Sequence, residues 1–354
     1  MLKLLKKIIK IILYLLVLLI IGIGCLFLYG TLTDYKPKAI ENVAIKGKGK
    51  NIDTNSVFSF ISWNIGYAAL GKEMDFFYDG GTSVKPPKEK YMKYMLGINT
   101  TISKLDSIDF FMLQEVDMKA KRSYYENQLD ALATHLPNDA YCFAKNYDVK
   151  YIPFPIGNPL GKEVSGLANY SKYKPIEATR YAFSSNFSWP KSIYFLDRCF
   201  LLNRYKLKNN KELIIINTHN SAFDANNELK PKELALIKKK AIEEYSKGNY
   251  VIVGGDWNQN PPRFDSTLII GDACKSIFPS IDEKLLPNAW QWGYQPTLPT
   301  NRDVDKCYSK GKTKTTIIDF FLLSPNIEVL TNKTIDVGFE HSDHQPIYMK
   351  VKLK

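Results

Sequence analysis

Two of the four histidines in this 354-residue chain lie in residues 340–346, where Ser342 is followed directly by Asp343 and His344. An imidazole moves protons near neutral pH, and a carboxylate offers oxygen ligands to a hard cation. Neighbouring residues on a strand point to opposite faces, so both side chains reach one site only where a strand ends in a loop. The same tripeptide occurs in ordinary surface turns, so its meaning depends on the strands that come before it.

Five apolar runs are typical of buried strands, and each ends in or carries a polar side chain. The runs span residues 57–64, 108–117, 213–219, 250–256 and 315–323, and their polar residues are Asn64, Glu115, His219, Asp256 with Asn258, and Asp319. The two-residue spacing of Asp256 and Asn258 predicts that both lie on one face. A single polar residue of this kind can be satisfied within a turn, but strand ends collect at one edge of a sheet. We therefore expect these side chains to meet Asp343 and His344 in one site.

Helices are predicted between the strands, over residues 88–106, 124–136 and 228–246. This alternation of strands and helices is typical of an α/β domain. Residues 66–87 form a long predicted loop with an aromatic segment at residues 75–81. Such a loop is as consistent with a lid or substrate wall as with a packed surface loop.

Six motifs in this order resemble those of the endonuclease/exonuclease/phosphatase superfamily, whose members have a deoxyribonuclease-I-like fold. They are Ser62-Trp63-Asn64, Leu113-Gln114-Glu115, Asn217-Thr218-His219, Gly254-Gly255-Asp256-Trp257-Asn258, Ile318-Asp319-Phe320 and Ser342-Asp343-His344. The resemblance covers the chain from residue 57 to the C-terminus. It implies a four-layer α/β sandwich, in which two packed mixed β-sheets are flanked by helices. It also implies hydrolysis of phosphoesters with the help of a divalent metal.

The resemblance implies a metal site as well. Glu115 would be the principal ligand of Mg²⁺, with Asn64 beside it and Asp343 contributing directly or through water. Oxygen ligands and retained waters are what Mg²⁺ prefers, and Mn²⁺ is an alternative ion. The ion would neutralise phosphate oxygens and stabilise the charge that develops during hydrolysis.

Catalytic roles for five further residues follow from the same resemblance. His344 would activate the attacking water, and Asp319 would orient the histidine. Asp256 would position or deprotonate the nucleophile, and Asn258 would bind a phosphate oxygen. His219 would bind the phosphate or protonate the leaving oxygen. Which group acts as base and which as acid stays open.

The N-terminus has the pattern of a membrane anchor. Lysines at positions 3, 6, 7 and 10 precede a run from residue 11 to residue 33 without Lys, Arg, Asp or Glu, which as a helix is long enough to cross a bilayer. The lysines should stay in the cytoplasm, so the rest of the chain would lie outside it. A cleaved signal peptide would need a small-x-small site, and none follows the run. A lipoprotein signal cut before Cys25 is the other alternative, although Gly22 stands where a larger aliphatic residue is usual.

These features divide the chain into three parts. Residues 1–33 are the cytoplasmic tip and transmembrane anchor, residues 34–55 a linker, and residues 56–354 the catalytic domain. The formal net charge of +12 favours polyanions or anionic surfaces, nucleic acid and phospholipid alike, although a generic Lys-rich surface has the same composition. The five cysteines form no C-x-x-C pair, which argues against a zinc knuckle.

The sequence therefore predicts a single-pass, membrane-anchored and metal-dependent phosphoesterase that acts outside the cytoplasm on phosphodiesters or phosphomonoesters. The substrate stays open between a lipid head group, a small diester and a nucleic acid, and an extracytoplasmic nuclease for DNA or RNA is the alternative function. A non-catalytic anchored binding protein is the contrasting class. Such a protein would be expected to have lost one or more catalytic residues, and all of them are present. The oligomeric state stays open.

Overall fold

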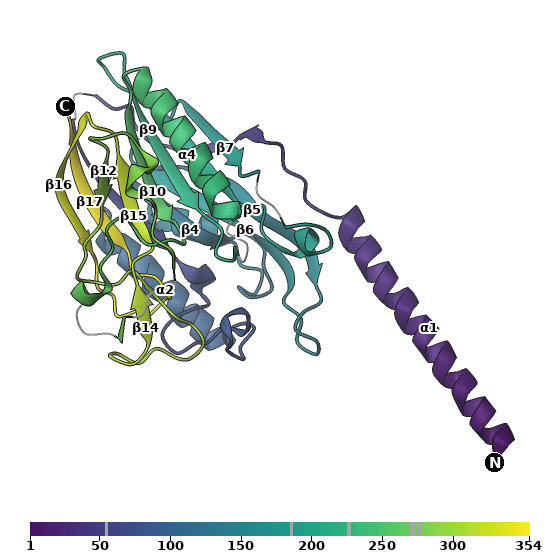
Figure 1. Cartoon of the computed structure of the whole chain (residues 1–354). Coiled ribbons are helices and arrows are strands. Elements are labelled where there is room, and N and C mark those ends of the chain that lie inside the picture. Colours follow the sequence, from purple (N-terminus) through teal and green to yellow (C-terminus); the bar gives the residue numbers. More distant parts are fainter. Residues whose placement is uncertain (54–55, 185–186, 225–227, 270–272, 275–277) are drawn as a thin grey trace.

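Two seven-stranded sheets pack face to face, with α4 against one outer face and α2 against the other (Figure 1). The computed structural model describes residues 1–53, 56–184, 187–224, 228–269, 273–274 and 278–354. Facing strands of the two sheets bury a shared core that includes Phe60, Phe110, Ile252 and Phe321. The predicted α/β sandwich of two mixed sheets flanked by helices is confirmed.

The first sheet has the strand order β1-β7-β8-β9-β10-β15-β12. Its strands are β1 (Ile40–Asn42), β7 (Glu177–Ala182), β8 (Cys199–Lys206), β9 (Glu212–His219), β10 (Tyr250–Asp256), β15 (Asp319–Leu323) and β12 (Gln291–Gly293). β9 runs parallel to β10, and β15 runs antiparallel to it. In this register Asp256 at the end of β10 pairs with His219 at the end of β9 and with Asp319 at the start of β15. Strand pairing alone therefore brings three predicted site residues to one edge.

The second sheet has the order β16-β17-β3-β4-β6-β5-β2. Its strands are β16 (Ile327–Thr334), β17 (Ile347–Leu353), β3 (Val57–Asn64), β4 (Phe110–Asp117), β6 (Gly161–Ser171), β5 (Ala140–Ile152) and β2 (Ile45–Gly47). The central strands β3 and β4 are parallel and buried along most of their length, which explains why their sequences are apolar almost without a break. Their register pairs Asn64 with Gln114, the neighbour of Glu115.

A third, small sheet has the order β11-β14-β13. Its strands are β11 (Ala273–Cys274), β14 (Lys314–Thr316) and β13 (Asn301–Arg302). The single strand predicted over residues 315–323 is wrong in one respect, because the chain leaves β14 at Thr316 and begins β15 only at Asp319. That break puts Asp319 at the first position of β15, at the same edge of the sheet as the other polar residues.

In the described part of the chain, three helices cover the sandwich: α2 (Lys88–Lys104), α3 (Gln128–His135) and α4 (Leu229–Ser246). α2 and α3 pack on the second sheet through buried residues such as Ile98 and Leu132. α4 packs on the first sheet through Leu234 and Ile237. Short 3-10 turns are η1 (Gly66–Ala68), η2 (Phe77–Asp79), η3 (Lys191–Tyr194), η4 (Ser266–Leu268) and η5 (Glu283–Leu285).

The helix predicted over residues 124–136 begins later than expected. Tyr124 and Tyr125 have positive φ angles of 56° and 62°, which lie outside the helical range. The helix starts at Gln128, where the Asn127 side chain accepts a hydrogen bond from a backbone N–H of the first turn. Such a cap satisfies one of the free donors at a helix start.

Residues 34–55 are more than the predicted linker. They contribute β1, which pairs with β7 of the first sheet, and β2, which pairs with β5 of the second. Each strand has three residues, too few to show the alternating pattern from which strands are predicted. The segment therefore ties the start of the domain to an edge of each sheet.

The N-terminal helix α1 (Leu2–Leu32) projects from the domain (Figure 1). Its mean hydropathy reaches 3.1, and it is long and apolar enough to cross a membrane. Length and composition are the whole of this finding, since a signal sequence meets the same criterion.

Candidate active site

A pocket of about 400 Å³ opens where the polar strand ends of the two sheets meet. Six of the eight predicted site residues line it: Glu115, His219, Asp256, Asn258, Asp343 and His344. The other two, Asn64 and Asp319, lie behind the pocket lining. Asn64 hydrogen-bonds to Asp256, and Asp319 hydrogen-bonds to His344. All the residues chosen from the strand ends therefore converge.

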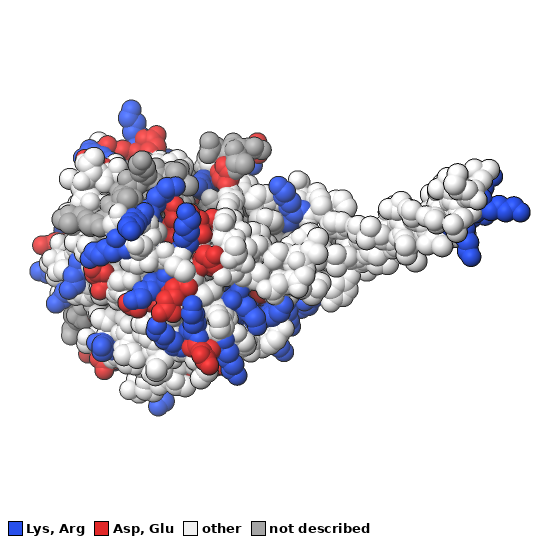
Figure 2. Space-filling model, turned by 90° about the horizontal axis from the view of Figure 1, so that it is seen from below, with Lys and Arg blue, Asp and Glu red and all other residues white. Residues whose placement is uncertain are grey.

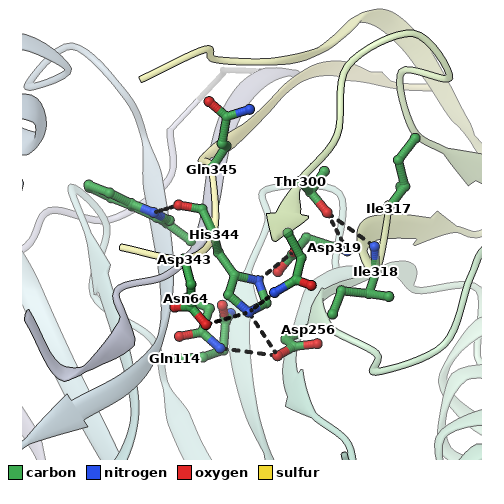
Figure 3. Close-up of polar contacts among 12 residues, drawn as sticks. Asn64, Gln114, Asp256, Thr300, Ile317, Ile318, Asp319, Asp343, His344 and Gln345 are labelled. Carbon is green, nitrogen blue, oxygen red and sulfur yellow. Dashed lines mark hydrogen bonds and ion pairs between the residues drawn. The ribbon is translucent and has the colours of Figure 1, made fainter. Parts of the chain in front are cut away.

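His344 and Asp319 form the shortest ionic contact of the site. Nδ1 of His344 lies 2.8 Å from Oδ2 of Asp319 (Figure 3). The backbone around the histidine is also held, because Trp63 Nε1 donates to its carbonyl at 3.0 Å and its N–H donates to Ser342 Oγ at 3.1 Å. Thr300 Oγ1 accepts the backbone N–H of Asp319 at 3.1 Å. The imidazole thus has one orientation, with Nε2 turned toward the pocket.

Burial shifts the pKa values of Asp319 and His344 in opposite directions. Burial raises the pKa of Asp319 to about 6. Burial alone would lower the pKa of His344, but the carboxylates of Asp319, Asp256 and Asp343 outweigh it and raise that pKa well above the usual range. The imidazole therefore holds a proton strongly in the absence of a cation.

The carboxylate of Asp256 makes most of the remaining polar contacts described for the site. Its Oδ2 accepts a hydrogen bond from Asn64 Nδ2 at 3.0 Å and lies 3.4 Å from Nε2 of His219 and 3.8 Å from Nε2 of His344. Its Oδ1 accepts the backbone N–H of Asn258 at 2.9 Å. One carboxylate oxygen thus faces both imidazoles of the site, a position suited to holding a water between them.

Asn258 reaches the pocket in a different way from the one predicted. The strand ends at Asp256, and Asn258 has a φ of 49°, so the two residues do not share a strand face. The Asn258 amide Nδ2 instead donates to the carbonyl of Asn220 at 2.9 Å. The tight turn after β10, rather than strand alternation, aims this side chain at the pocket.

Glu115 enters the pocket through an irregularity in β4. The pairing of β4 with β6 shifts between Leu113 and Val116, and Glu115 has a φ of 57°. A bulge of this kind re-aims a side chain. The nearest ionisable partner of its carboxylate is His219 Nε2, at 3.7 Å. Burial, and then the negative charge of Asp343, raise the pKa of Glu115 to about 8.

His219 is held neutral. Burial is the main cause that lowers its pKa well below the usual range, and the positive charges of Arg198 and His344 add to it. Its Nδ1 is buried without a hydrogen-bond partner among the described residues. The Nε2 atom, which faces Asp256 and Glu115, is the ring position that can contact a substrate oxygen.

The donor set fits a hard divalent cation. Asp343, like Glu115, has its pKa raised chiefly by burial, and in the described part of the chain the ion pairs of the four site carboxylates are all with histidine. Buried carboxylates without a permanent cation attract one. Atoms of Asp256, Asp319 and His344 also lie within 4.8 Å of one another, but His344 and Asp319 already engage each other. Glu115 and Asp343, with Asn64 beside them, are the residues that could hold such a cation.

Comparison with known families agrees with this geometry. A sequence profile of the Endonuclease/Exonuclease/phosphatase family matches residues 61–344. The chain belongs to this family. Comparison with curated protein sequences gives no match.

Solved structures of endonuclease/exonuclease/phosphatase proteins have the same fold. One from Beutenbergia cavernae is 15% identical, with a TM-score of 0.55 over 84% of this chain and 72% of that one. ANGEL2, a 2′,3′-cyclic phosphatase in complex with adenosine-2′,3′-vanadate, is 14% identical, with a TM-score of 0.54 over 88% and 99%. D. rerio TDP2 in complex with a single-strand DNA product is 15% identical, with a TM-score of 0.52 over 84% and 100%.

The structure of this family member also reveals a site residue that the sequence did not indicate. Nδ2 of Asn301 lies 3.0 Å from Nε2 of His344, and Asn301 lines the pocket. Its strand β13 has only two residues. The neighbouring Arg302 fixes the segment by donating to the carbonyls of Leu70 and Gly71 at 3.0 and 2.9 Å. No apolar run precedes Asn301, so no strand-end signal marks it.

The other histidines lie outside the pocket. His135 is partly buried at the end of α3, with Nδ1 3.0 Å from Ser103 Oγ. His341 lies beside Gly97 and Tyr94 of α2. The pocket is therefore lined by two imidazoles, those of His219 and His344.

Proposed function

We propose that this chain is a divalent-metal-dependent phosphoesterase that hydrolyses phosphodiester or phosphomonoester bonds by attack of water. The observation that carries the proposal is the convergence of the His344–Asp319 pair and Asp256 on the floor of one pocket, next to Glu115 and Asp343. Membership of the endonuclease/exonuclease/phosphatase family supports it. Mg²⁺ is the ion that we expect, with Mn²⁺ as a substitute, because the donors are oxygen atoms.

In this proposal the two imidazoles share the proton transfers. His344 exchanges a proton with the attacking water at Nε2, while Asp319 fixes its ring and stabilises its protonated form. Asp256, with Oδ2 3.8 Å from Nε2 of His344, orients that water. His219, held neutral, donates from Nε2 to a phosphate or leaving oxygen. Asn258 binds a phosphate oxygen.

Glu115, Asp343 and Asn64 would hold the cation. A bound Mg²⁺ would neutralise phosphate oxygens and stabilise the developing charge. Arg198 lines the same pocket, and its Nη1 is buried without a hydrogen-bond partner among the described residues. Its guanidinium is therefore a further candidate for binding a phosphate oxygen.

A nuclease that acts on DNA or RNA is the second candidate. It is supported by the net charge of +12 and by the shared fold with TDP2, which was solved with a single-strand DNA product. On the face seen in Figure 2, however, Lys and Arg are interspersed with Asp and Glu instead of forming one basic band. The pocket wall is rich in aromatic side chains. These features favour a compact or lipid-linked phosphoester over a long nucleic acid.

We further propose that α1 is retained as an anchor and that the domain lies outside the cytoplasm. Four lysines precede the apolar run of α1, and such residues are enriched on the cytoplasmic side. Mass spectrometry of the N-terminus in purified membranes tests this proposal. An intact N-terminus is expected, whereas a chain that begins at Cys25 with a lipid attached would replace the anchor by a lipoprotein.

Hydrolysis assays test the enzymatic proposal directly. The full-length chain, in detergent micelles with Mg²⁺, Mn²⁺ or EDTA, would be given bis(4-nitrophenyl) phosphate, 4-nitrophenyl phosphate, supercoiled DNA and RNA. We expect metal-dependent release of nitrophenolate, which His344→Gln abolishes and which the matched variant His135→Gln retains. Cleavage of nucleic acid alone would make the nuclease function primary. No hydrolysis of any substrate would contradict the proposal and favour a non-catalytic binding protein.

A further inference from the structure

The last turns of α1 pack against the domain beside the pocket. The ring of Phe27 lies 5.9 Å from Trp189 and 6.4 Å from Tyr194, between centroids. Trp189 Nε1 donates to Thr31 Oγ1 at 3.1 Å. A side chain at Gly30 would come within 2.9 Å of Ile193. The helix is therefore seated on η3 and the residues before it.

The length of α1 fixes where this contact lies relative to a membrane. A hydrocarbon core about 30 Å thick needs about 20 helical residues at about 1.5 Å each. Counted from Ile11, the first residue after the last N-terminal lysine, that length ends near Gly30. The turn that packs against Trp189 and Ile193 is thus level with the outer boundary of the hydrocarbon. The surface around it must meet the bilayer.

That surface carries large exposed apolar side chains. Trp189 is 62% exposed, Phe154 46%, Ile156 91% and Tyr151 42%; we call these four residues the rim. Phe154 stands edge-on to Tyr194 at 6.2 Å between centroids, which joins the two segments of the rim. Figure 2 shows mainly uncharged residues where the helix meets the domain. Exposed apolar clusters of this kind mark interaction surfaces, and Trp and Tyr favour the membrane interface.

The rim continues into the wall of the catalytic pocket. Tyr194, Phe195 and Phe187 all line the pocket, and Phe195 lies 4.6 Å from Phe187 and 6.5 Å from Tyr78, between ring centroids. Tyr194, which packs against α1, and Phe195 of the pocket wall thus belong to one hydrophobic cluster, which also contains Phe27. An apolar path leads from the bilayer boundary to the floor that holds His344.

We propose that the rim docks on the bilayer that α1 spans and that the pocket takes an amphiphilic phosphoester from it, with the phosphate at His344 and the apolar chain along the aromatic wall. This inference rests on the proposed phosphoesterase function and on retention of α1. It makes the membrane both the anchor of the enzyme and the source of its substrate.

Two chromogenic phosphodiesters with the same leaving group separate this proposal from general phosphoesterase activity. Methyl 4-nitrophenyl phosphate is soluble, and hexadecyl 4-nitrophenyl phosphate is embedded in vesicles of phosphatidylcholine with phosphatidylglycerol. In each, water attacks phosphorus, the bond to the nitrophenyl oxygen breaks, and nitrophenolate leaves with the alkyl phosphate as the other product. For the full-length protein in the same vesicles, we expect kcat/KM to be at least about 100-fold higher for the hexadecyl ester, because the bilayer concentrates this ester at the surface where α1 holds the enzyme. Equal rates would overturn the proposal.

A charge on the rim provides the matched test. Ile156→Glu should lower hydrolysis of the hexadecyl ester by about tenfold or more, because a carboxylate resists entry into the bilayer. Hydrolysis of the methyl ester should change by less than about twofold, since Ile156 does not line the pocket. Leu330→Glu, at an exposed apolar position on β16, is the control and should change neither. An equal loss on both esters would overturn the proposal.

Docking itself has a readout that does not need catalysis. Tryptophan fluorescence would be measured in vesicles that contain phosphatidylcholine with a doxyl quencher near the head group. We expect quenching that Trp189→Phe removes and that Ile156→Glu weakens. Quenching that is unchanged in Trp189→Phe would refute docking. If quenching follows this expectation but neither ester is hydrolysed, the phosphoesterase function fails while the membrane surface stands.

Discussion

Strand β4 carries two carboxylates, the partly buried Glu115 and the fully buried Asp117, that have opposite surroundings. Asp117 accepts hydrogen bonds from Arg122 Nη2 at 2.9 Å and Nε at 3.1 Å, and Glu163 lies 3.1 Å from the same guanidinium. The partner nearest to Glu115 is Nε2 of the neutral His219, at 3.7 Å. Burial raises the pKa of both carboxylates. The difference is that Asp117 forms an ion pair with a guanidinium, whereas among the described residues Glu115 forms an ion pair only with a histidine.

This difference separates a structural cluster from a reactive one. Burial opposes the charge of Arg122, but Asp117 and Glu163 raise its pKa well above the usual range, so the guanidinium stays charged and holds its neighbours. Its Cζ lies 3.2 Å from the ring centroid of Tyr67, and both Arg122 and Tyr67 line the pocket. Glu115 has no guanidinium partner of this kind among the described residues, so its carboxylate oxygens can take a cation from solution as the group loses its proton. A carboxylate that has no guanidinium partner among the described residues thus distinguishes the pocket from the structural cluster.

The largest effect is expected for Glu115→Gln. The substitution keeps the size of the side chain and removes the charge that would bind the metal, so kcat/KM for bis(4-nitrophenyl) phosphate should fall by about 10³-fold or more. Glu163→Gln is the same change in the structural cluster and should retain most activity per folded molecule. Steady-state kinetics with a metal titration measure both. Similar activities for the two variants would remove the distinction between the clusters.

The reverse pattern is expected for Asp117→Asn. Arg122 keeps Glu163 but loses the negative charge of Asp117, and we expect the free energy of unfolding to fall by about 3 kcal/mol, at the low end for breaking a buried ion pair. Activity per folded molecule should stay within about twofold, because Asp117 does not line the pocket. Chemical denaturation and active-fraction kinetics measure these quantities. A loss of activity without a loss of stability would show that Asp117 acts in the site.

The third prediction concerns pH and metal together. A pKa of about 8 for Glu115 lies above the usual value near 4.3, so this group stabilises the fold fully at low pH. That contribution is lost as the pH rises through about 8. A divalent cation compensates the charge that then forms, so the rise in Tm caused by Mg²⁺ should be larger at about pH 9 than at about pH 6. Thermal unfolding with and without Mg²⁺ measures this rise in Tm. If Glu115→Gln shows the same rise as the wild type at both pH values, the metal is held by other ligands.

Sequence reasoning predicted the fold and most of the site because both depend on strong, local patterns. Buried strands need apolar runs, and parallel register carries their last residues to one edge, which is how Asn64, His219 and Asp256 could be grouped. The bulge that turns Glu115 inward and the positive φ of Asn258 leave no such pattern. Their residue types could be recognised in the sequence, but the backbone geometry that brings them to the pocket could not be predicted from it.

Other features depend on contacts between distant segments. The pairing of Arg122 with Glu163, the two edge strands in residues 34–55 and the packing of Phe27 on Trp189 join parts of the chain far apart in sequence. A single sequence contains no periodic signal for such contacts. Asn301 is the clearest case in the site, since it belongs to a strand of two residues and yet contacts His344.

The smallest effect is expected for Asn301→Ala. Asn301 Nδ2 faces Nε2 of His344 at 3.0 Å, so it donates to the ring when that nitrogen carries no proton. Loss of this donor favours the protonated ring, and the limb of the pH–rate profile that reports His344 should move to higher pH, with kcat lowered by about tenfold or less. The exposed apolar position Leu330 on β16 serves again as the control, and Leu330→Ala should leave the profile unchanged. A variant of Asn301 with the wild-type profile would show that His344, held by Asp319, needs no second partner to set its proton affinity.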